Sequence, residues 1–375
     1  MHLVATVILL LWVVAFVTTI LNLATIPRLN PAARPTQEWM VSVIIPARNE
    51  ARVIERTVRA MLAQSYSAFE IIVVDDRSTD ETGAIVRAIS DSRLRVVDGE
   101  ETPPSWLGKP WALQQGTLHA RGELLLFVDA DVVYAPRTLP AAVAQLESSG
   151  AAMMTLFPHF EMHGFAENAA MPMLGFFAFT VLPLWWSNRS KHVGLALGGG
   201  SGNLIRREAF DVVGQFERLK GAVVDDVALG RLARQHGVAT RAVLADDMIS
   251  VRMYRGAREI VDGFCKNIFI ALGRSFTAAV AMMVFGFALH LLPYGLAVTG
   301  DPISIATVIV ITLIRVVLFR SLRYPLANAI FLHPVMIVFW ATIFLRSVWM
   351  TGIRRQLVWR GRTYDATQTR FGAER

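Results

Sequence analysis

The sequence predicts an α/β fold with a mostly parallel sheet, held in a membrane by apolar segments at both ends. Apolar runs alternate with helix-forming stretches across residues 40–131, the pattern of a parallel sheet with helices on both faces. Three of the apolar runs end abruptly in polar residues. The mean hydropathy is +0.43, too high for an ordinary soluble enzyme, and the excess is concentrated at the two ends of the chain.

Four strands are expected, at residues 41–46, 71–74, 94–97 and 124–128, because each is a short and mostly apolar run. Amphipathic spacing predicts a helix after the first strand. A capping box at residues 78–81 predicts that another helix starts directly after the second. Proline and glycine mark the start and end of a third helix before the fourth strand.

The polar residues that follow the first, second and fourth strands are Asn49, Glu50, Asp75, Asp76, Asp129 and Asp131. Each cluster alone is compatible with a capped or solvated loop. Because open α/β sheets bind ligands at the carboxyl ends of their strands, we expect the three clusters to share one site. Two carboxylates spaced like Asp129 and Asp131 can hold a divalent cation, and such a cation can neutralise a diphosphate.

Two further motifs lie downstream. The glycine-rich loop at residues 198–203 lacks the ending of a P-loop, and close backbone approach to a substrate is its expected use. Asp225 and Asp226 open a predicted helix. Acids in a first turn favour the helix dipole, which alone explains most such pairs; the functional alternative is that one of them is a general base.

Taken in order, these motifs resemble family 2 glycosyltransferases of the GT-A fold, over about residues 40–250. The motifs are Ile45-Pro46-Ala47-Arg48-Asn49-Glu50, Val74-Asp75-Asp76-Arg77-Ser78-Thr79-Asp80, Asp129-Ala130-Asp131, Gly199-Gly200-Ser201-Gly202-Asn203 and Asp225-Asp226. Three other segments resemble the membrane-bound hopene-associated and carotenoid-type members: residues 106–112, 253–254 and 359–364.

The resemblance implies a role for each matching residue. The nucleotide-sugar site would comprise Pro46, Ala47, Glu50, Asp75, Asp76, Lys109 and Asp129. Within it, Asp76 or Asp75 would bind the base and Lys109 would lie near the diphosphate. Asp131, with Asp129, would ligate Mg²⁺ or Mn²⁺. Asp226 would be the catalytic base, next to Asp225. The acceptor side would comprise Gly200, Ser201, Gly202 and Asn203.

The hydropathy pattern divides the chain into six parts: an N-terminal membrane anchor (1–26), a Pro-rich linker (27–39), the GT-A domain (40–250), an interfacial amphipathic helix (251–275), about three membrane segments (276–350) and a basic tail (351–375). Residues 169–186 are expected to dip into the membrane. Basic clusters flank the last membrane segment on both sides, so this segment either spans against the positive-inside rule or turns back near Pro334.

The expected protein is thus a multi-pass protein of the cell (inner) membrane with a cytoplasmic catalytic domain. It would transfer one sugar, from a UDP-sugar, to a terpenoid-like lipid hydroxyl with inversion. The chain lacks the Gln-x-x-Arg-Trp motif of processive synthases, which argues against a polymer product. The net charge is +7, and the arginines cluster beside the membrane segments. Anionic lipid therefore explains the excess of positive charge more simply than nucleic acid does. A single cysteine excludes an internal disulfide.

Three alternatives remain at this point. A polyprenyl-phosphate glycosyltransferase shares the fold and the membrane setting. A sugar nucleotidyltransferase also has an acidic α/β site, but the glycine-rich turn expected after its first strand is missing here. The third alternative is an inactive, nucleotide-binding membrane scaffold.

Overall fold

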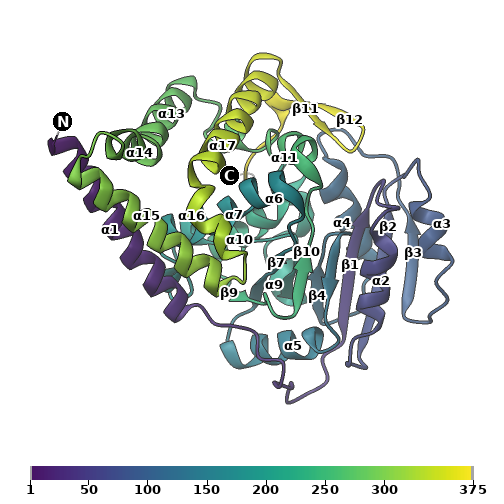
Figure 1. The fold of residues 1–375 in the computed structure, drawn as a ribbon. Coiled ribbons are helices and arrows are strands. Elements are labelled where there is room, and N and C mark those ends of the chain that lie inside the picture. The colour runs from purple at the N-terminus through teal and green to yellow at the C-terminus, as the bar shows by residue number, and fades with distance from the viewer. Residues whose placement is uncertain (1, 373–375) are drawn as a thin grey trace.

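The computed structural model describes residues 2–372 and joins an α/β domain to a group of apolar helices (Figure 1). Within these residues the main sheet has seven strands, in the order β3-β2-β1-β4-β8-β6-β9. The strands are β1 (Val41–Ala47), β2 (Phe69–Asp75), β3 (Leu94–Asp98), β4 (Leu124–Phe127), β6 (Met153–Phe157), β8 (Asn203–Arg206) and β9 (Thr240–Leu244). Only β8 runs antiparallel to its neighbours among these described strands, so the prediction of a mostly parallel sheet is confirmed.

Both faces of the sheet are buried, which explains the nearly continuous apolar runs. Successive strand residues point to opposite faces. Accordingly, Val43 and Ile45 pack into one core, whereas Ile44 packs into the other. The first core includes residues of α2 (Ile54–Leu62) and α5 (Thr138–Ser149), and the second includes residues of α4 (Gly108–His119), α9 (Arg207–Val212) and α10 (Asp225–Gln235).

A three-stranded sheet of β5 (Val132–Tyr134), β10 (Ile249–Val251) and β7 (His159–Phe160) adjoins the first core. The predicted capping box does not form. Helix α3 (Thr82–Arg87) begins where Asp80 Oδ1 accepts the amide of Thr82 at 3.0 Å. The Ser78 hydroxyl instead accepts the amide of Asn49 at 3.1 Å, because the loop after β1 packs against this turn.

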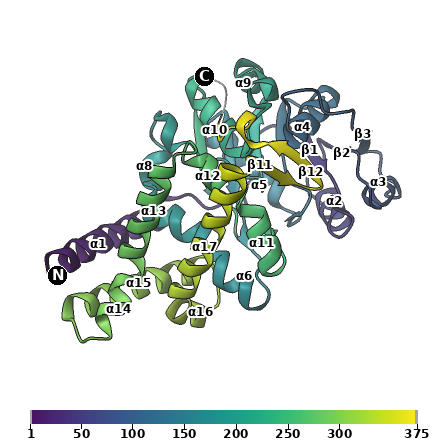
Figure 2. The same ribbon diagram turned by 90° about the horizontal axis from the view of Figure 1, so that it is seen from above.

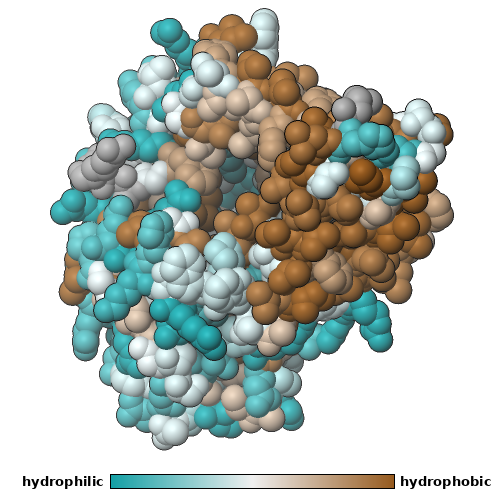
Figure 3. Space-filling model, turned by 90° about the vertical axis from the view of Figure 1, so that its left-hand side faces the viewer, coloured by the Kyte–Doolittle hydropathy of each residue, from teal (hydrophilic) through white to brown (hydrophobic). Residues whose placement is uncertain are grey.

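Four described helices are long and apolar enough to cross a membrane, one near the N-terminus and three in the C-terminal part of the chain. They are α1 (His2–Thr25), the pair α13 (Phe276–His290) and α14 (Leu292–Ala297), α15 (Pro302–Ser321), and α17 (His333–Ser347) with its π-helical extension Val348–Ile353. Helix α1 lies along α15 and α7 (Pro172–Val181) (Figures 1 and 2). Figure 3 shows the broad apolar face on this side of the molecule.

The last membrane segment is broken. Helix α16 (Leu326–Phe331) is separated from α17 by Leu332, next to Pro334. Arg323 before the segment pairs with Asp247, and Arg362 after it pairs with Asp76. Arg323 and Arg362 thus each pair with an aspartate of the α/β domain, and whether the segment spans the membrane or turns back stays a prediction.

The prediction of a single amphipathic helix over residues 251–275 is wrong in detail. The segment forms two short helices, α11 (Gly256–Phe264) and α12 (Ile268–Ala271). The break is explained by a tertiary contact, because the amide of Phe269 donates to Ser347 Oγ at 3.0 Å instead of continuing the helix. Ile260, on the apolar side of α11, packs against α6 (Gly164–Ala170) and α17. The proline-broken segment after α6 continues as α7 and α8 (Leu184–Ser187).

Candidate active site

A cavity of about 1110 Å³ opens at the carboxyl edge of the sheet, between the α/β domain, α11, α12 and the end of α17. Nine of the residues proposed from the sequence line it: Pro46, Ala47, Glu50, Asp76, Lys109, Asp129, Asp131, Asp225 and Asp226. They come from the ends of β1, β2 and β4 and from the first turns of α4 and α10. Carboxylates far apart in the sequence therefore face one cavity.

Lys109 connects the two halves of this acidic group. Its Nζ lies 2.7 Å from Asp129 Oδ1 and 3.3 Å from Asp225 Oδ1. Burial alone would lower the pKa of Lys109, but Asp129, Asp225 and Asp226 together raise it well above its ordinary value. Burial raises the pKa of Asp225 to about 6, although Lys109 opposes the shift. The sequence placed Lys109 near the diphosphate; here it bridges the end of β4 to the start of α10.

Negative charge is in excess around Asp131. Burial, with the nearby charges of Asp129 and Glu50, raises the pKa of Asp131 to about 8. Burial also raises the pKa of Glu50 to about 7, even though Arg360 lies 2.5 Å from its Oε1. Among the described residues no three His, Cys, Asp or Glu side chains form a complete metal-binding group. A cation at Asp131 would therefore need oxygen ligands from a substrate or water.

The glycine-rich loop lies against Asp129. The Asp129 amide donates to Gly200 O at 2.8 Å, and a Cβ on Gly200 would stand 2.0 Å from Asp129 Oδ2. Gly200 and Asn203 line a small recess beside the main cavity, together with Asp129 and Asp226. Neither cavity is lined by Ser201, whose hydroxyl donates to Leu156 O at 2.5 Å, or by Gly202. The sequence predicted that the backbone of this loop would approach another group closely. In the structure that group is the carboxylate of Asp129.

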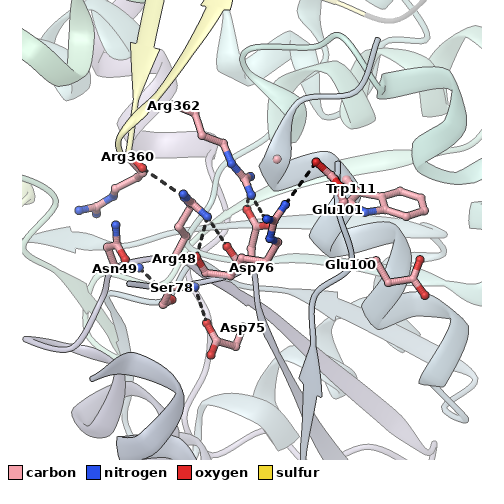
Figure 4. A network of polar contacts seen from close by, with 12 residues as sticks. Arg48, Asn49, Asp75, Asp76, Ser78, Glu100, Glu101, Trp111, Arg360 and Arg362 are labelled. Carbon is pink, nitrogen blue, oxygen red and sulfur yellow. Dashed lines mark hydrogen bonds and ion pairs between the residues drawn. The ribbon is translucent and has the colours of Figure 1, made fainter. Parts of the chain in front are cut away.

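Of the two acids that follow β2, only Asp76 faces the cavity. The Asp75 carboxylate accepts the Ser78 amide at 3.1 Å and lies beside Gly83 of α3, so it belongs to the strand–helix turn. Arg362 binds both oxygens of Asp76, at 2.6 and 3.0 Å (Figure 4). Burial raises the pKa of Asp76, and Arg362 opposes that shift.

A C-terminal hairpin that the sequence reasoning did not assign to the site docks beside Glu50 and Asp76. It consists of β11 (Gln356–Trp359) and β12 (Arg362–Asp365). Arg48 Nε donates to Arg360 O at 3.1 Å, and the Gly108 amide donates to the Tyr364 hydroxyl at 3.2 Å. A Cβ on Gly108 would lie 2.2 Å from Arg362 Nη1, so a larger residue there would have to displace the Arg362 guanidinium. In the sequence, residues 359–364 drew notice only because they resemble the membrane-bound family members. That resemblance did not assign them to the site.

Part of the cavity lining is apolar, among polar residues such as Asp262, Asn267 and Arg346. The apolar part consists of Leu174 of α7, Ile268 and Ala271 of α12, Trp340 of α17 and Met350 of its extension. Helix α17 is one of the helices long and apolar enough to span a membrane. The same cavity thus joins the acidic edge of the sheet to a wall that belongs to the apolar helices.

Residues 42–214 match the family model described as glycosyl transferase family 2. The chain is 24% identical, over 88% of its length and 89% of the relative's, to 4,4'-diaponeurosporenoate glycosyltransferase of Staphylococcus aureus strain MRSA252. The protein of the same name from strain USA300 gives the same figures. Among solved structures, mannosyltransferase PcManGT from Pyrobaculum calidifontis, in complex with GDP-Man and Mn²⁺, aligns with a TM-score of 0.51 at 21% identity, covering 92% of this chain and 99% of that one. Residues 42–214 therefore match the family 2 glycosyltransferase model and lie in a domain of the GT-A-like fold, and the chain as a whole is similar to the carotenoid-type enzymes.

Proposed function

We propose that this protein is a membrane-bound, inverting glycosyltransferase that moves one sugar from a nucleoside-diphosphate sugar, expected to be a UDP-sugar, to a lipid acceptor. One observation carries the proposal: a single cavity contains both the carboxylates of the sheet edge and an apolar wall from a candidate membrane helix. A charged donor and an apolar acceptor can meet only in a site of this kind.

The donor would occupy the end formed by β1, β2 and β4. Pro46 and Ala47 supply backbone and apolar surface for the nucleoside, and Asp76 supplies a carboxylate for the polar edge of the base. Arg362 holds that carboxylate in the observed arrangement. Binding of a base at Asp76 would therefore share or displace the Arg362 contact.

Mg²⁺ or Mn²⁺ fits the excess of negative charge at Asp131. Oxygen ligands suit both ions, and Mg²⁺ commonly takes one or two carboxylates plus substrate phosphates. Asp131, with Asp129, would hold the ion, which would offset charge on the leaving diphosphate. Asp129 is held for this role by Lys109 and by the Gly200 carbonyl.

Asp226 would take the proton of a hydroxyl acceptor. The acceptor oxygen bonds to the anomeric carbon while the bond from that carbon to the diphosphate oxygen breaks. The electron pair leaves with the diphosphate, and attack from the opposite face inverts the anomeric carbon. Asp225 would not compete as the base, because its carboxylate is already paired with Lys109.

The acceptor would reach Asp226 from the apolar part of the cavity. Leu174, Ile268, Trp340 and Met350 offer it a surface that a polar acceptor would not need. The Staphylococcus aureus relative is named for a carboxylate substrate, 4,4'-diaponeurosporenoate. A carboxylate acceptor is therefore the second candidate beside the hydroxyl, and it would need little help from a base because it is already ionised.

The test is sugar transfer by purified protein in liposomes. Each of several nucleotide sugars would be offered with Mn²⁺ and with three matched long-chain isoprenoid acceptors: an alcohol, a carboxylic acid and a phosphate. We expect transfer to the alcohol or the acid, abolished by Asp131→Asn. Transfer to the phosphate alone would favour the polyprenyl-phosphate alternative. No transfer by protein that still binds nucleotide would favour the scaffold.

The acceptors also separate the two candidate mechanisms. Asp226→Asn should slow transfer to the alcohol strongly but leave transfer to the acid within a few-fold of the unmodified protein.

We also propose that the catalytic domain lies on the cytoplasmic side of the membrane. The basic clusters at residues 320–323 and 354–362 lie at the end of the apolar helices that adjoins this domain.

A further inference from the structure

Lys266 lies in the break between α11 and α12 and lines the main cavity. In one continuous helix through residues 256–275, helical spacing would place Lys266 largely opposite apolar residues such as Ile260 and Phe264. The break reverses this, and its ammonium group lies over the Trp359 ring, 4.9 Å from the ring centroid. Burial lowers the pKa of Lys266 to about 8, and Lys109 and Arg360 lower it further, while Asp225 and Asp129 oppose the shift.

The other basic residues along the cavity already have oxygen partners. Lys109 holds Asp129 and Asp225, and Arg360 holds Glu50. Arg48 donates to the carbonyls of Asp76 and Arg77. Arg346 and Arg258 both contact Asp262. Among the described residues that line the cavity, Lys266 is the one cation whose recorded contact is an aromatic face and not an oxygen.

We propose that Lys266 binds an oxygen of the donor's diphosphate. A buried ammonium gains most from an anionic partner, and no protein carboxylate is in ion-pair contact with it among the described residues. A diphosphate held at Asp131 through a cation would carry further negative oxygens toward the facing wall of the cavity. Lys266, which is close enough to Lys109, Asp225 and Asp129 to be affected by their charges, would supply positive charge to the diphosphate and would also stabilise the leaving group.

The inference rests on the proposed function, since it needs a nucleoside-diphosphate donor. Its test is binding of defined probes to the full-length protein in detergent, measured by calorimetry with Mn²⁺ present. The probes are UDP and GDP, each compared with its own nucleoside, uridine or guanosine. The variants are Lys266→Met, the conservative Lys266→Arg, and Lys191→Met as a control at an exposed lysine.

We expect Lys266→Met to weaken binding of the preferred diphosphate by about 10- to 100-fold, the usual range for a hydrogen bond to a charged group. Nucleoside binding should stay within about twofold, and Lys266→Arg should restore most of the loss. Lys191→Met should match the unmodified protein.

Other results would overturn the inference. Unchanged diphosphate binding in Lys266→Met, with a raised KM for the acceptor, would assign the ammonium to an acceptor anion. Equal loss of diphosphate and nucleoside binding would assign it a structural role. Failure of the unmodified protein to bind either UDP or GDP would count against the proposed function itself, so the two failures can be told apart.

Discussion

Replacement of Asp226 by asparagine is the sharpest test of the mechanism, because the structure separates its effect on rate from its effect on folding. Asp226 is half-buried in the first turn of α10, and its Oδ1 accepts the amide of Val227 at 2.8 Å. The asparagine carbonyl oxygen can accept the same hydrogen bond. The substitution therefore removes a charge and a proton acceptor but keeps size and local contacts.

The two expected losses differ in size. Loss of a carboxylate near a helix N-terminus costs about 0.3–1 kcal/mol of stability. Loss of a general base slows the reaction about 10²- to 10⁴-fold, or roughly 3–5 kcal/mol in the barrier. The chemical effect should thus exceed the structural effect several-fold.

The assay is transfer to the alcohol acceptor at saturating donor, with donor binding and the unfolding temperature measured on the same preparation. Asp211→Asn, at an exposed acid of the neighbouring helix α9, is the control. We expect kcat to fall by the full factor while donor affinity changes less than threefold. Equal loss of donor binding, or an alcohol rate within tenfold of the unmodified protein, would refute the assignment of Asp226 as base.

Three further predictions follow from the site. Gly200→Ala should lower activity more than tenfold and raise the Mn²⁺ concentration needed, since its Cβ would stand 2.0 Å from Asp129 Oδ2; a normal Mn²⁺ titration would contradict this. Arg362→Ala breaks a buried ion pair worth about 3 kcal/mol, so amide exchange in residues 356–365 should accelerate about 100-fold; unchanged exchange would mean that other contacts hold the hairpin. Activity should fall further as pH drops below about 6, because Asp225 is then protonated and releases Lys109, and Asp225→Asn should remove this component of the pH profile while leaving the components from Asp131 and Glu50 at higher pH.

Strands β1, β2 and β4 could be predicted because they are buried on both faces. A run such as residues 41–46 is almost entirely apolar, and this pattern can be recognised without knowledge of its partner strands. The convergence of Asp76, Asp131 and Asp226 on one cavity followed from the rule for parallel sheets and from the family resemblance. Their individual roles stay predictions.

Tertiary contacts explain the features that could not be predicted from the sequence. Periodicity extended one helix through Lys266, but the hydrogen bond from Phe269 to Ser347 ends it there. Asp75 and Asp76 are indistinguishable in the sequence; the direction of each side chain at the end of β2 separates them. The Arg362–Asp76 pair joins residues that are 286 positions apart, and the local sequence around either residue does not predict this contact.

The hairpin links the two halves of the site through the chain itself. Helix α17, which lines the apolar part of the cavity, continues through its π-helical extension into β11 with only Arg354 and Arg355 between them. The arginines of that hairpin then reach the carboxylates of Glu50 and Asp76, at the end proposed for the nucleotide. Charge interactions strengthen where water is excluded. If the donor binds as proposed, loosening the hairpin should admit water and weaken donor binding even where no donor contact is removed.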